Sequence, residues 1–209
     1  KEQQHLTIGL SGLQNEEHWF NGKSPASFFQ LKGIVESILQ LLGLNNCKES
    51  ALIAHEIWEE GITINHQKKE IAKIGLLNSD LLSKMDVSSS CYIAELNWDA
   101  ILPYAHKTST SFQHINKFQK VYRDLSFLIN EEITFNELLK CVGTVKNKIL
   151  QNVSLFDVYR NKKTLPNKKA YGLRFSFLHT ERTLTDKEVD KVMKQVQEKI
   201  TKEVNAELR

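Results

Sequence analysis

Arginine is absent from the first 122 residues of this 209-residue sequence. All five arginines follow this point, from Arg123 to Arg209. Proteins that hold phosphate or carboxylate groups commonly use the planar guanidinium, which donates two parallel hydrogen bonds to one anion. We therefore expect the first half of the chain to have no arginine clamp for phosphate and no chemistry that needs one.

Cysteine and long apolar runs are also scarce. The three cysteines, Cys47, Cys91 and Cys141, form no pair at metal or redox spacing, and an odd number argues against a disulfide framework. No apolar run approaches the roughly 20 residues that a membrane helix needs. The first residues lack the apolar segment of a secretory signal. We expect a cytoplasmic protein with no membrane partner.

Common catalytic motifs are missing as well. His55 and Glu56 resemble the start of a zinc-binding H-E-x-x-H helix, but position 59 is Glu. The seven histidines show no ligand spacing, and there is no P-loop, no G-x-G-x-x-G and no G-x-S-x-G. The carboxylates of Glu56, Glu59 and Glu60 are more typical of a charged surface turn than of an acid–base pair. We predict no catalytic residue, no metal site and no cofactor site in this chain.

The sequence does contain a sharp division of charge. Residues 1–110 carry 9 lysines against 13 acidic residues, whereas residues 111–209 carry 19 basic residues against 12 acidic ones. This division indicates two domains with different partners, the second of which faces an anion. A Ser/Thr-rich stretch at 103–117 has no apolar periodicity and predicts a linker. We place the domains at 1–108 and 116–209, joined by residues 109–115.

The first domain is predicted to be α+β with a mostly antiparallel sheet. Residues 24–44 have the apolar spacing of a helix whose buried face includes Leu31 and Val35. Phe29 and Leu41 extend this apolar stripe beyond one face, so we expect part of it to stay exposed. The other elements expected here are strands at 6–12, 61–64, 70–77 and 91–96 and a short helix at 79–85.

The second domain predicts the order β-α-β-β-α-β of a ferredoxin-like, RRM-like sandwich. Two helices, 134–149 and 185–204, each begin with a Thr and Glu at capping-box spacing. The strands expected around them are 122–129, 153–159, 170–177 and 206–209. In this order both helices cover one face of the sheet and leave the other face open.

Strand alternation assigns side chains to these two faces. The side chains predicted to face the helices are Leu125, Phe127, Leu173, Phe175 and Phe177. Those predicted to point away are Asp124, Ser126, Arg174 and Ser176. By the same period Asp157 and Tyr159 share one face, opposite Phe156 and Val158. RNA-recognition modules of this topology bind RNA on the open face, and Tyr159 is the one ring expected there. A solvated face with an Asp124–Arg174 ion pair is the alternative.

A basic segment follows the predicted strand 153–159. From position 160 to 169 there are five basic residues and no acid, and residues 146–182 contain nine basic residues against two acids. Self-repulsion of this size would be relieved by a polyanion. A solvated surface loop is the alternative.

The same region carries a specific resemblance. It contains an F-D-x-Y strand (156–159), a basic loop with Leu-Pro, Lys168-Lys169 at the start of the next strand, and an R-T-L-x-D run at 182–186. Through these motifs and their order, residues 116–209 resemble the ferredoxin-fold anticodon-binding domain of phenylalanyl-tRNA synthetase β subunits. Residues 1–108 are similar to the end of the catalytic-like module of that subunit, a degenerate class II synthetase-like module with an antiparallel sheet.

This resemblance implies a non-catalytic part of phenylalanine–tRNA ligase, an α2β2 enzyme. The implied partners are tRNA(Phe) and the alpha subunit, not DNA, while ATP and magnesium would act elsewhere in the complete enzyme. In the family the first anticodon base meets the Asp of the F-D-x-Y strand, here Asp157, and a Ser after Lys-Lys, here Ala170. The residues we predict to bind tRNA are Asp157, Tyr159, Arg160, Lys162, Lys163, Lys168, Lys169, Arg174 and Arg123.

Two other interpretations remain. The second domain could be a protein–protein interaction module with a ferredoxin-like fold, whose open face binds another subunit and whose basic patch binds an acidic surface. A single-chain organellar synthetase carries the same last domain, but it would need phosphate-binding arginines directly upstream, and this sequence has none there.

Overall fold

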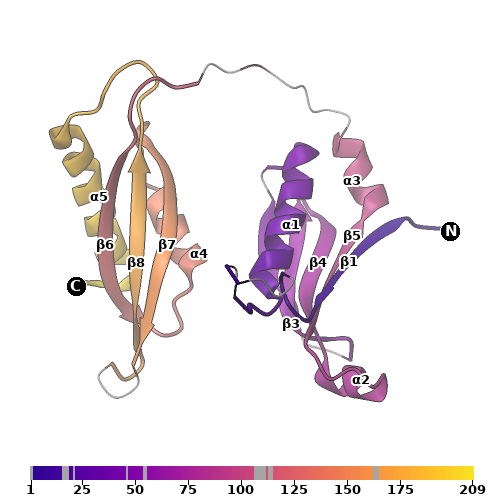
Figure 1. Cartoon of the computed structure of the whole chain (residues 1–209). Helices are drawn as coiled ribbons and strands as arrows, with labels where there is room; N and C mark the ends of the chain where they lie inside the picture. Colours follow the sequence, from indigo (N-terminus) through magenta and orange to yellow (C-terminus); the bar gives the residue numbers. More distant parts are fainter. Residues whose placement is uncertain are drawn as a thin grey trace. The chain divides into compact units, whose positions relative to one another are not determined.

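The computed structural model describes residues 2–15, 19–20, 22–45, 47–53, 56–105, 112, 115–161 and 165–209. The chain forms two compact units, Lys1–Ser111 and Phe112–Arg209 (Figure 1). The division falls inside the predicted linker, 109–115, most of which lies outside the described residues. Among the described helices none is long and apolar enough to cross a membrane.

The first unit is built on a five-stranded antiparallel sheet with the order β1-β5-β4-β3-β2. Its strands are β1 (His5–Ser11), β2 (Lys48–Ala51), β3 (Trp58–His66), β4 (Lys69–Leu77) and β5 (Cys91–Asn97). Its helices are α1 (Phe28–Leu41), α2 (Ser79–Lys84) and α3 (Trp98–Ala105). The predicted α+β class with an antiparallel sheet is confirmed.

Helix α1 forms where the apolar spacing predicts it. The Ser27 hydroxyl accepts a hydrogen bond from the backbone N–H of Gln30 at 3.3 Å and so caps the first turn. Gly43 follows the helix with φ +80, a conformation that glycine adopts without strain. The buried side chains of α1 are Leu31, Val35 and Leu39. Phe29 is 80% exposed and Leu41 84%, as expected for the part of the stripe that extends beyond the buried face.

Two elements of the first unit were not predicted. Helix α3 includes residues 103–105, which the sequence assigned to a linker. The Asn97 side chain accepts the N–H of Ala100 at 3.0 Å, and Ile101 is fully buried, so the helix forms despite Pro103. Strand β2 consists of four exposed residues paired only with β3, and it therefore has no apolar alternation to detect.

The second unit is a four-stranded antiparallel sheet with the order β7-β8-β6-β9. Its strands are β6 (Val121–Asn130), β7 (Leu150–Arg160), β8 (Lys168–Phe177) and β9 (Glu207–Leu208). Its helices are α4 (Phe135–Gly143) and α5 (Asp186–Val204), which lie on one side of the sheet (Figure 1). The predicted ferredoxin-like order is confirmed.

Both capping boxes are formed. In each, the Glu side chain accepts the N–H of the capping residue, at 2.7 Å from Thr134 to Glu137 and at 3.0 Å from Thr185 to Glu188. The predicted helix end at 149 is wrong, because α4 ends at Gly143 and the Thr144 hydroxyl donates to the Cys141 carbonyl at 2.7 Å.

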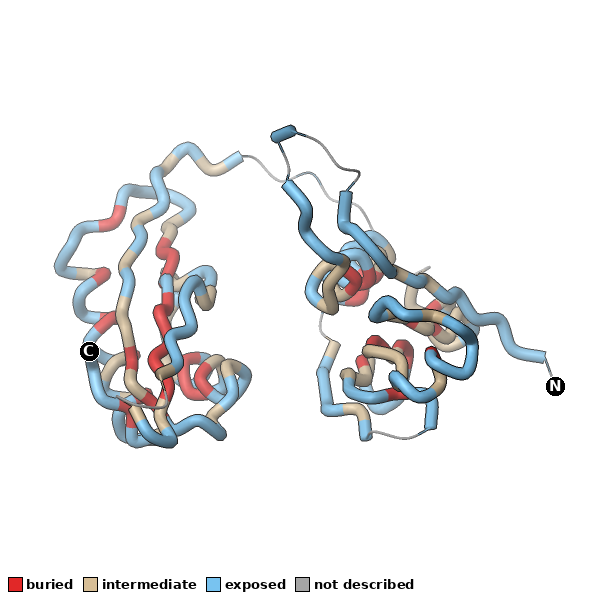
Figure 2. The backbone as a smooth tube through the Cα atoms, turned by 60° about the horizontal axis from the view of Figure 1, so that its bottom comes forward, coloured by how far each residue is buried: buried red, intermediate tan, exposed pale blue. Residues whose placement is uncertain are grey.

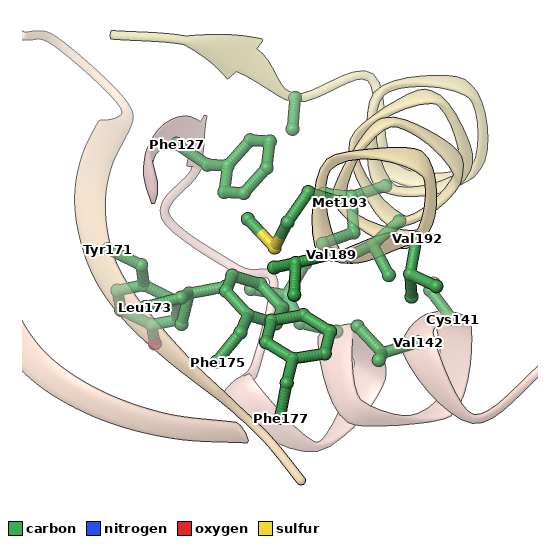
Figure 3. Close-up of a cluster of buried hydrophobic side chains, with 14 of the residues drawn as sticks. Phe127, Cys141, Val142, Tyr171, Leu173, Phe175, Phe177, Val189, Val192 and Met193 are labelled. Carbon is green, nitrogen blue, oxygen red and sulfur yellow. The ribbon is translucent and has the colours of Figure 1, made fainter. Parts of the chain in front are cut away.

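The core of the second unit lies between the sheet and its two helices (Figure 3). The side chains that alternation predicted to face the helices are fully buried, with the exception of Leu125. Leu125 is partly buried against the same core. Strand β8 carries much of this buried surface, and Figure 2 shows its run of buried residues next to largely exposed edge segments. The chain has therefore placed its apolar face against the helices and left the opposite face of the sheet for other uses.

Candidate nucleic-acid interface

A β-bulge in β7 determines which side chains reach the open face. The register shifts between Leu155, which pairs with Leu173, and Asp157, which pairs with Gly172. The intervening residue, Phe156, is the extra one. A Cβ added to Gly172 would lie 2.9 Å from Phe156 Cζ and 3.0 Å from Asp157 Cβ. Both side chains therefore lie on the open face, above β8.

The position of Phe156 on the open face corrects one prediction, and the register of β7 against β8 confirms another. Strict alternation placed Phe156 opposite Asp157 and made Tyr159 the one ring on the open face, and both statements are wrong. The bulge adds the Phe156 ring, which is 54% exposed. Asp157 and Tyr159 do share a face, because they pair with Gly172 and Ala170 while Val158 pairs with the core residue Tyr171.

Small residues of β8 form the floor of the open face. Ala170 is 3% exposed and Gly172 is also buried, although neither faces the helices. They are covered by the larger side chains that lie over them from β7. The open face is therefore not simply solvated: its centre is lined with rings and guanidinium groups.

Tyr159 is held in place by two contacts. The Asn161 side-chain amide donates to the Tyr159 hydroxyl at 3.1 Å. The guanidinium carbon of Arg209 lies 5.3 Å from the centre of the Tyr159 ring, a cation–π distance. The ring is still 40% exposed. Such a ring is a preorganised surface for stacking an unpaired base, and Asp157 beside it can accept hydrogen bonds from a base edge.

Arg174 is paired with an acid of the neighbouring strand. Its Nε and one terminal nitrogen donate to the two carboxylate oxygens of Asp124 at 2.9 and 2.7 Å. Hydrogen bonding from Arg174 lowers the pKa of Asp124, and the carboxylate raises the pKa of Arg174. The ion pair that we kept as an alternative is present. A guanidinium neutralised in this way attracts phosphate less than a free one does.

Lys169 is not a loop residue. It is the second residue of β8 and is only 4% exposed. Its ammonium donates to the Glu131 carbonyl at 2.6 Å and lies 4.9 Å from the centre of the Tyr171 ring. The prediction that Lys169 belongs to a solvent-facing basic loop is therefore wrong, and the side chain is occupied in the fold.

Three further predicted cations are paired with acids from distant positions. Arg160 contacts Glu131 at 2.9 Å, Lys168 contacts Glu207 at 2.6 Å, and Arg123 contacts Asp186 at 2.6 Å. Arg123 makes its contact with the first turn of α5, so the structure separates it from Asp157 and Tyr159. The argument from uncompensated self-repulsion therefore does not hold for Arg160 and Lys168, because it counted only acids that are near in sequence.

These pairs leave phosphate binding possible. Ion pairs between exposed side chains contribute about 0–1 kcal/mol each, so a phosphate can replace the carboxylate partner at little cost. Lys162 and Lys163 lie outside the described residues. In the described part of the loop, the Leu165 N–H donates to the Asn161 carbonyl at 2.8 Å, and the Lys168 N–H donates to the Leu165 carbonyl at 3.3 Å.

The first unit has several hollows among its described residues, and none of them is lined by an arginine. A hollow on its sheet has a volume of about 70 Å³ and is lined by His5, Glu70, Lys73 and Glu95 among others. A second hollow, lined by Gln3, Gln4, His5, Leu6 and Trp98, measures about 520 Å³, within the range of about 300–1,000 Å³ that is usual for small-molecule sites. His5 Nδ1 lies 2.8 Å from a carboxylate oxygen of Glu95, and Lys73 Nζ lies 3.2 Å from a carboxylate oxygen of Glu70. In the part of the chain that the structure describes, no three His, Cys, Asp or Glu side chains are placed to hold a metal ion.

Comparison with known proteins agrees with this arrangement. Residues 116–209 match the ferredoxin-fold anticodon binding domain, and residues 1–98 match the phenylalanyl tRNA synthetase beta chain CLM domain. The whole chain is 30% identical to a phenylalanine–tRNA ligase beta subunit of Bacteroides fragilis, 31% identical to that of Bacteroides thetaiotaomicron and 32% identical to that of Nitrosococcus oceani. It covers 26% of the length of each of these relatives.

The two matched domains occur in the order that the sequence predicted, and the open sheet face belongs to the second of them. The chain therefore belongs to the phenylalanine–tRNA ligase beta-subunit family, and it spans about a quarter of the length of the relatives that it matches.

Proposed function

We propose that residues 116–209 bind the anticodon arm of tRNA(Phe), with unpaired bases received on the open face of the β7-β8-β6-β9 sheet. One observation carries this proposal: Asp157 and Tyr159 lie next to each other on the open face, above the small residues Ala170 and Gly172. The Tyr159 ring is held there by Asn161 and Arg209. The match to an anticodon-binding domain supports the class of ligand.

Two kinds of residue would have different roles in this binding. Lys162, Lys163, Lys168 and Arg160 lie in or beside the loop that joins β7 to β8, and they would contact phosphates. Asp157 repels phosphate, so its place in this region is explained by hydrogen bonds from a base edge. Ala170 cannot supply the hydroxyl contact expected of a Ser, which leaves Asp157 as the main polar determinant of base choice on this strand pair.

We also propose the setting of this function. The chain would be a non-catalytic part of a cytoplasmic enzyme that joins phenylalanine to its tRNA at the expense of ATP, with magnesium. The active site would lie on the alpha subunit, the second partner. The first unit would act as scaffold, because it contains no arginine that could clamp a phosphate.

The proposal is tested by measuring the binding of tRNA(Phe) and of an unrelated tRNA to the full chain at several salt concentrations. We expect the logarithm of affinity for both to fall linearly with the logarithm of salt, since phosphate contacts release counterions. Replacing Asp157 with Ala should reduce the preference for tRNA(Phe) by about 1–3 kcal/mol without changing the salt slope. Equal, salt-independent binding of both tRNAs, or none, would contradict the proposal and favour a protein–protein interaction module.

A further inference from the structure

The bulge at Phe156 creates a second aromatic surface on the open face. A phenylalanine that only covered the sheet would be buried, yet this ring is 54% exposed. It lies over Gly172, the one residue type that leaves room for it, because any Cβ at that position would come within 2.9 Å of the ring. Gly172 thus leaves room for the Phe156 ring, whose Cζ and Cε2 atoms approach it, while about half of Phe156 stays exposed.

A guanidinium is held beside the ring. The central carbon of Arg174 lies 5.3 Å from the centre of the Phe156 ring. Both carboxylate oxygens of Asp124 accept from Arg174, which fixes the orientation of the plane and largely neutralises its charge. Arg174 is therefore better suited to stacking against a flat group than to attracting a phosphate.

The same arrangement occurs twice on this face. Tyr159 and Arg209 form one ring–guanidinium pair, and Phe156 and Arg174 form the other, each with 5.3 Å between guanidinium carbon and ring centre. Both rings come from β7 and project over β8. Aromatic rings and guanidinium planes are the groups on which proteins stack successive unpaired RNA bases.

We infer that Phe156 and Arg174 form a second base-stacking position, so that the sheet holds two unpaired nucleobases, one at Tyr159 and one at Phe156. This inference rests on the proposed function and deepens it, because it adds a second base to the one that Asp157 and Tyr159 would receive. Gly172 is a positioning residue for the second site, since it acts through the Phe156 ring.

The test uses the full chain and an RNA hairpin with the anticodon stem and loop of tRNA(Phe), with the fluorescent base 2-aminopurine at one unpaired position at a time. Stacking changes the emission of this base. In the unchanged chain we expect emission to change at two loop positions on binding. Phe156→Leu should abolish the change at one of them and Tyr159→Leu at the other, while Phe156→Tyr, which keeps the ring, should preserve both.

Affinity provides the second readout. Phe156→Leu should weaken hairpin binding by about 5- to 140-fold, the range that one stacked base contributes, with an unchanged salt slope. Phe29→Leu replaces an exposed ring on α1 of the first unit and is the matched control, for which we expect no change. Gly172→Ala should also weaken binding, and its effect should not add to that of Phe156→Leu if it acts by displacing the ring.

The outcomes separate the two proposals. If the unchanged chain binds the hairpin with the expected salt slope but Phe156→Leu changes neither emission nor affinity, the second stacking position is refuted and the proposed function stands. If the unchanged chain does not bind the hairpin at all, both are refuted. Thermal unfolding of each variant, followed by far-ultraviolet circular dichroism, identifies any loss of affinity that comes from unfolding, and such a loss in Phe156→Leu would count against the inference.

Discussion

Replacing Lys169 with Met distinguishes a lysine used by the fold from one used by RNA. In the structure the Lys169 ammonium is buried, donates to the Glu131 carbonyl at 2.6 Å and contacts the Tyr171 ring. Met retains most of the buried stem and removes only the charged group. A hydrogen bond from a charged donor contributes about 1.5–3 kcal/mol, and a cation–π contact contributes roughly 0.5–2 kcal/mol.

These gains are offset in part because the folded protein must desolvate the ammonium. We therefore expect Lys169→Met to lower the free energy of unfolding of the second unit by about 2 kcal/mol. For a unit of this size, a loss of 1 kcal/mol lowers the melting temperature by about 4–8 °C, so the expected decrease is about 8–16 °C. Lys168→Met is the matched control: its side chain is exposed and paired with Glu207, and its loss should cost no more than about 1 kcal/mol.

The distribution of tryptophan makes the measurement specific. All three tryptophans, Trp19, Trp58 and Trp98, lie in the first unit, so their fluorescence reports on that unit alone. Circular dichroism reports on both units. Lys169→Met should shift the dichroism transition, leave the tryptophan transition in place and leave the salt slope of tRNA binding unchanged. An unchanged melting curve together with a salt slope smaller by about one would show that Lys169 binds phosphate and would refute the reasoning.

Three further predictions test other parts of the structure. Hydrogen bonds from Arg182 and Thr185 lower the pKa of Glu188 below its ordinary value of 4.5. The charged form of Glu188 therefore stabilises the second unit, and Glu188→Gln should lower the melting temperature. This decrease should be largest above pH 4.5 and should shrink as the pH falls below that value. We expect the chain to associate at high concentration through the exposed Phe29 and Leu41, so Phe29→Ser combined with Leu41→Ser should reduce this association in sedimentation velocity without lowering the melting temperature. Arg123→Ala should leave tRNA affinity and salt slope unchanged, since Arg123 pairs with α5 on the helix-covered face, and a weaker affinity would contradict that placement.

The topology of the second unit was predictable because several independent signals agreed. Two capping boxes marked the starts of the helices, and period-two alternation marked the face of β8 that meets them. The same alternation extends to Lys169. Counting back in steps of two from Phe177 passes Tyr171 and reaches Lys169, which predicts that Lys169 faces the helices.

The bulge could not be predicted from β7 alone. An extra residue changes the period at one point, and the segment 153–159 fits a regular strand equally well. The physical reason for the bulge lies on the partner strand, where Gly172 leaves space for a ring. The signal therefore consists of a glycine in β8 opposite an aromatic residue in β7, which becomes visible only after the two strands have been paired in register.

The ion pairs of the candidate interface could not be predicted from local sequence either, and they affect how RNA would bind. Arg160 and Lys168 meet acids about 30 and 40 positions away, which a local count of charge does not include. Because exposed pairs are weak, RNA can displace Glu131 and Glu207, and each displaced carboxylate then lies near a phosphate. The bidentate Asp124–Arg174 pair is harder to open, and it would remain intact beside a base stacked on Phe156. The second unit thus has ion pairs beside the β7–β8 loop that can exchange with phosphate, and an ion pair on the open face that holds a stacking plane in place.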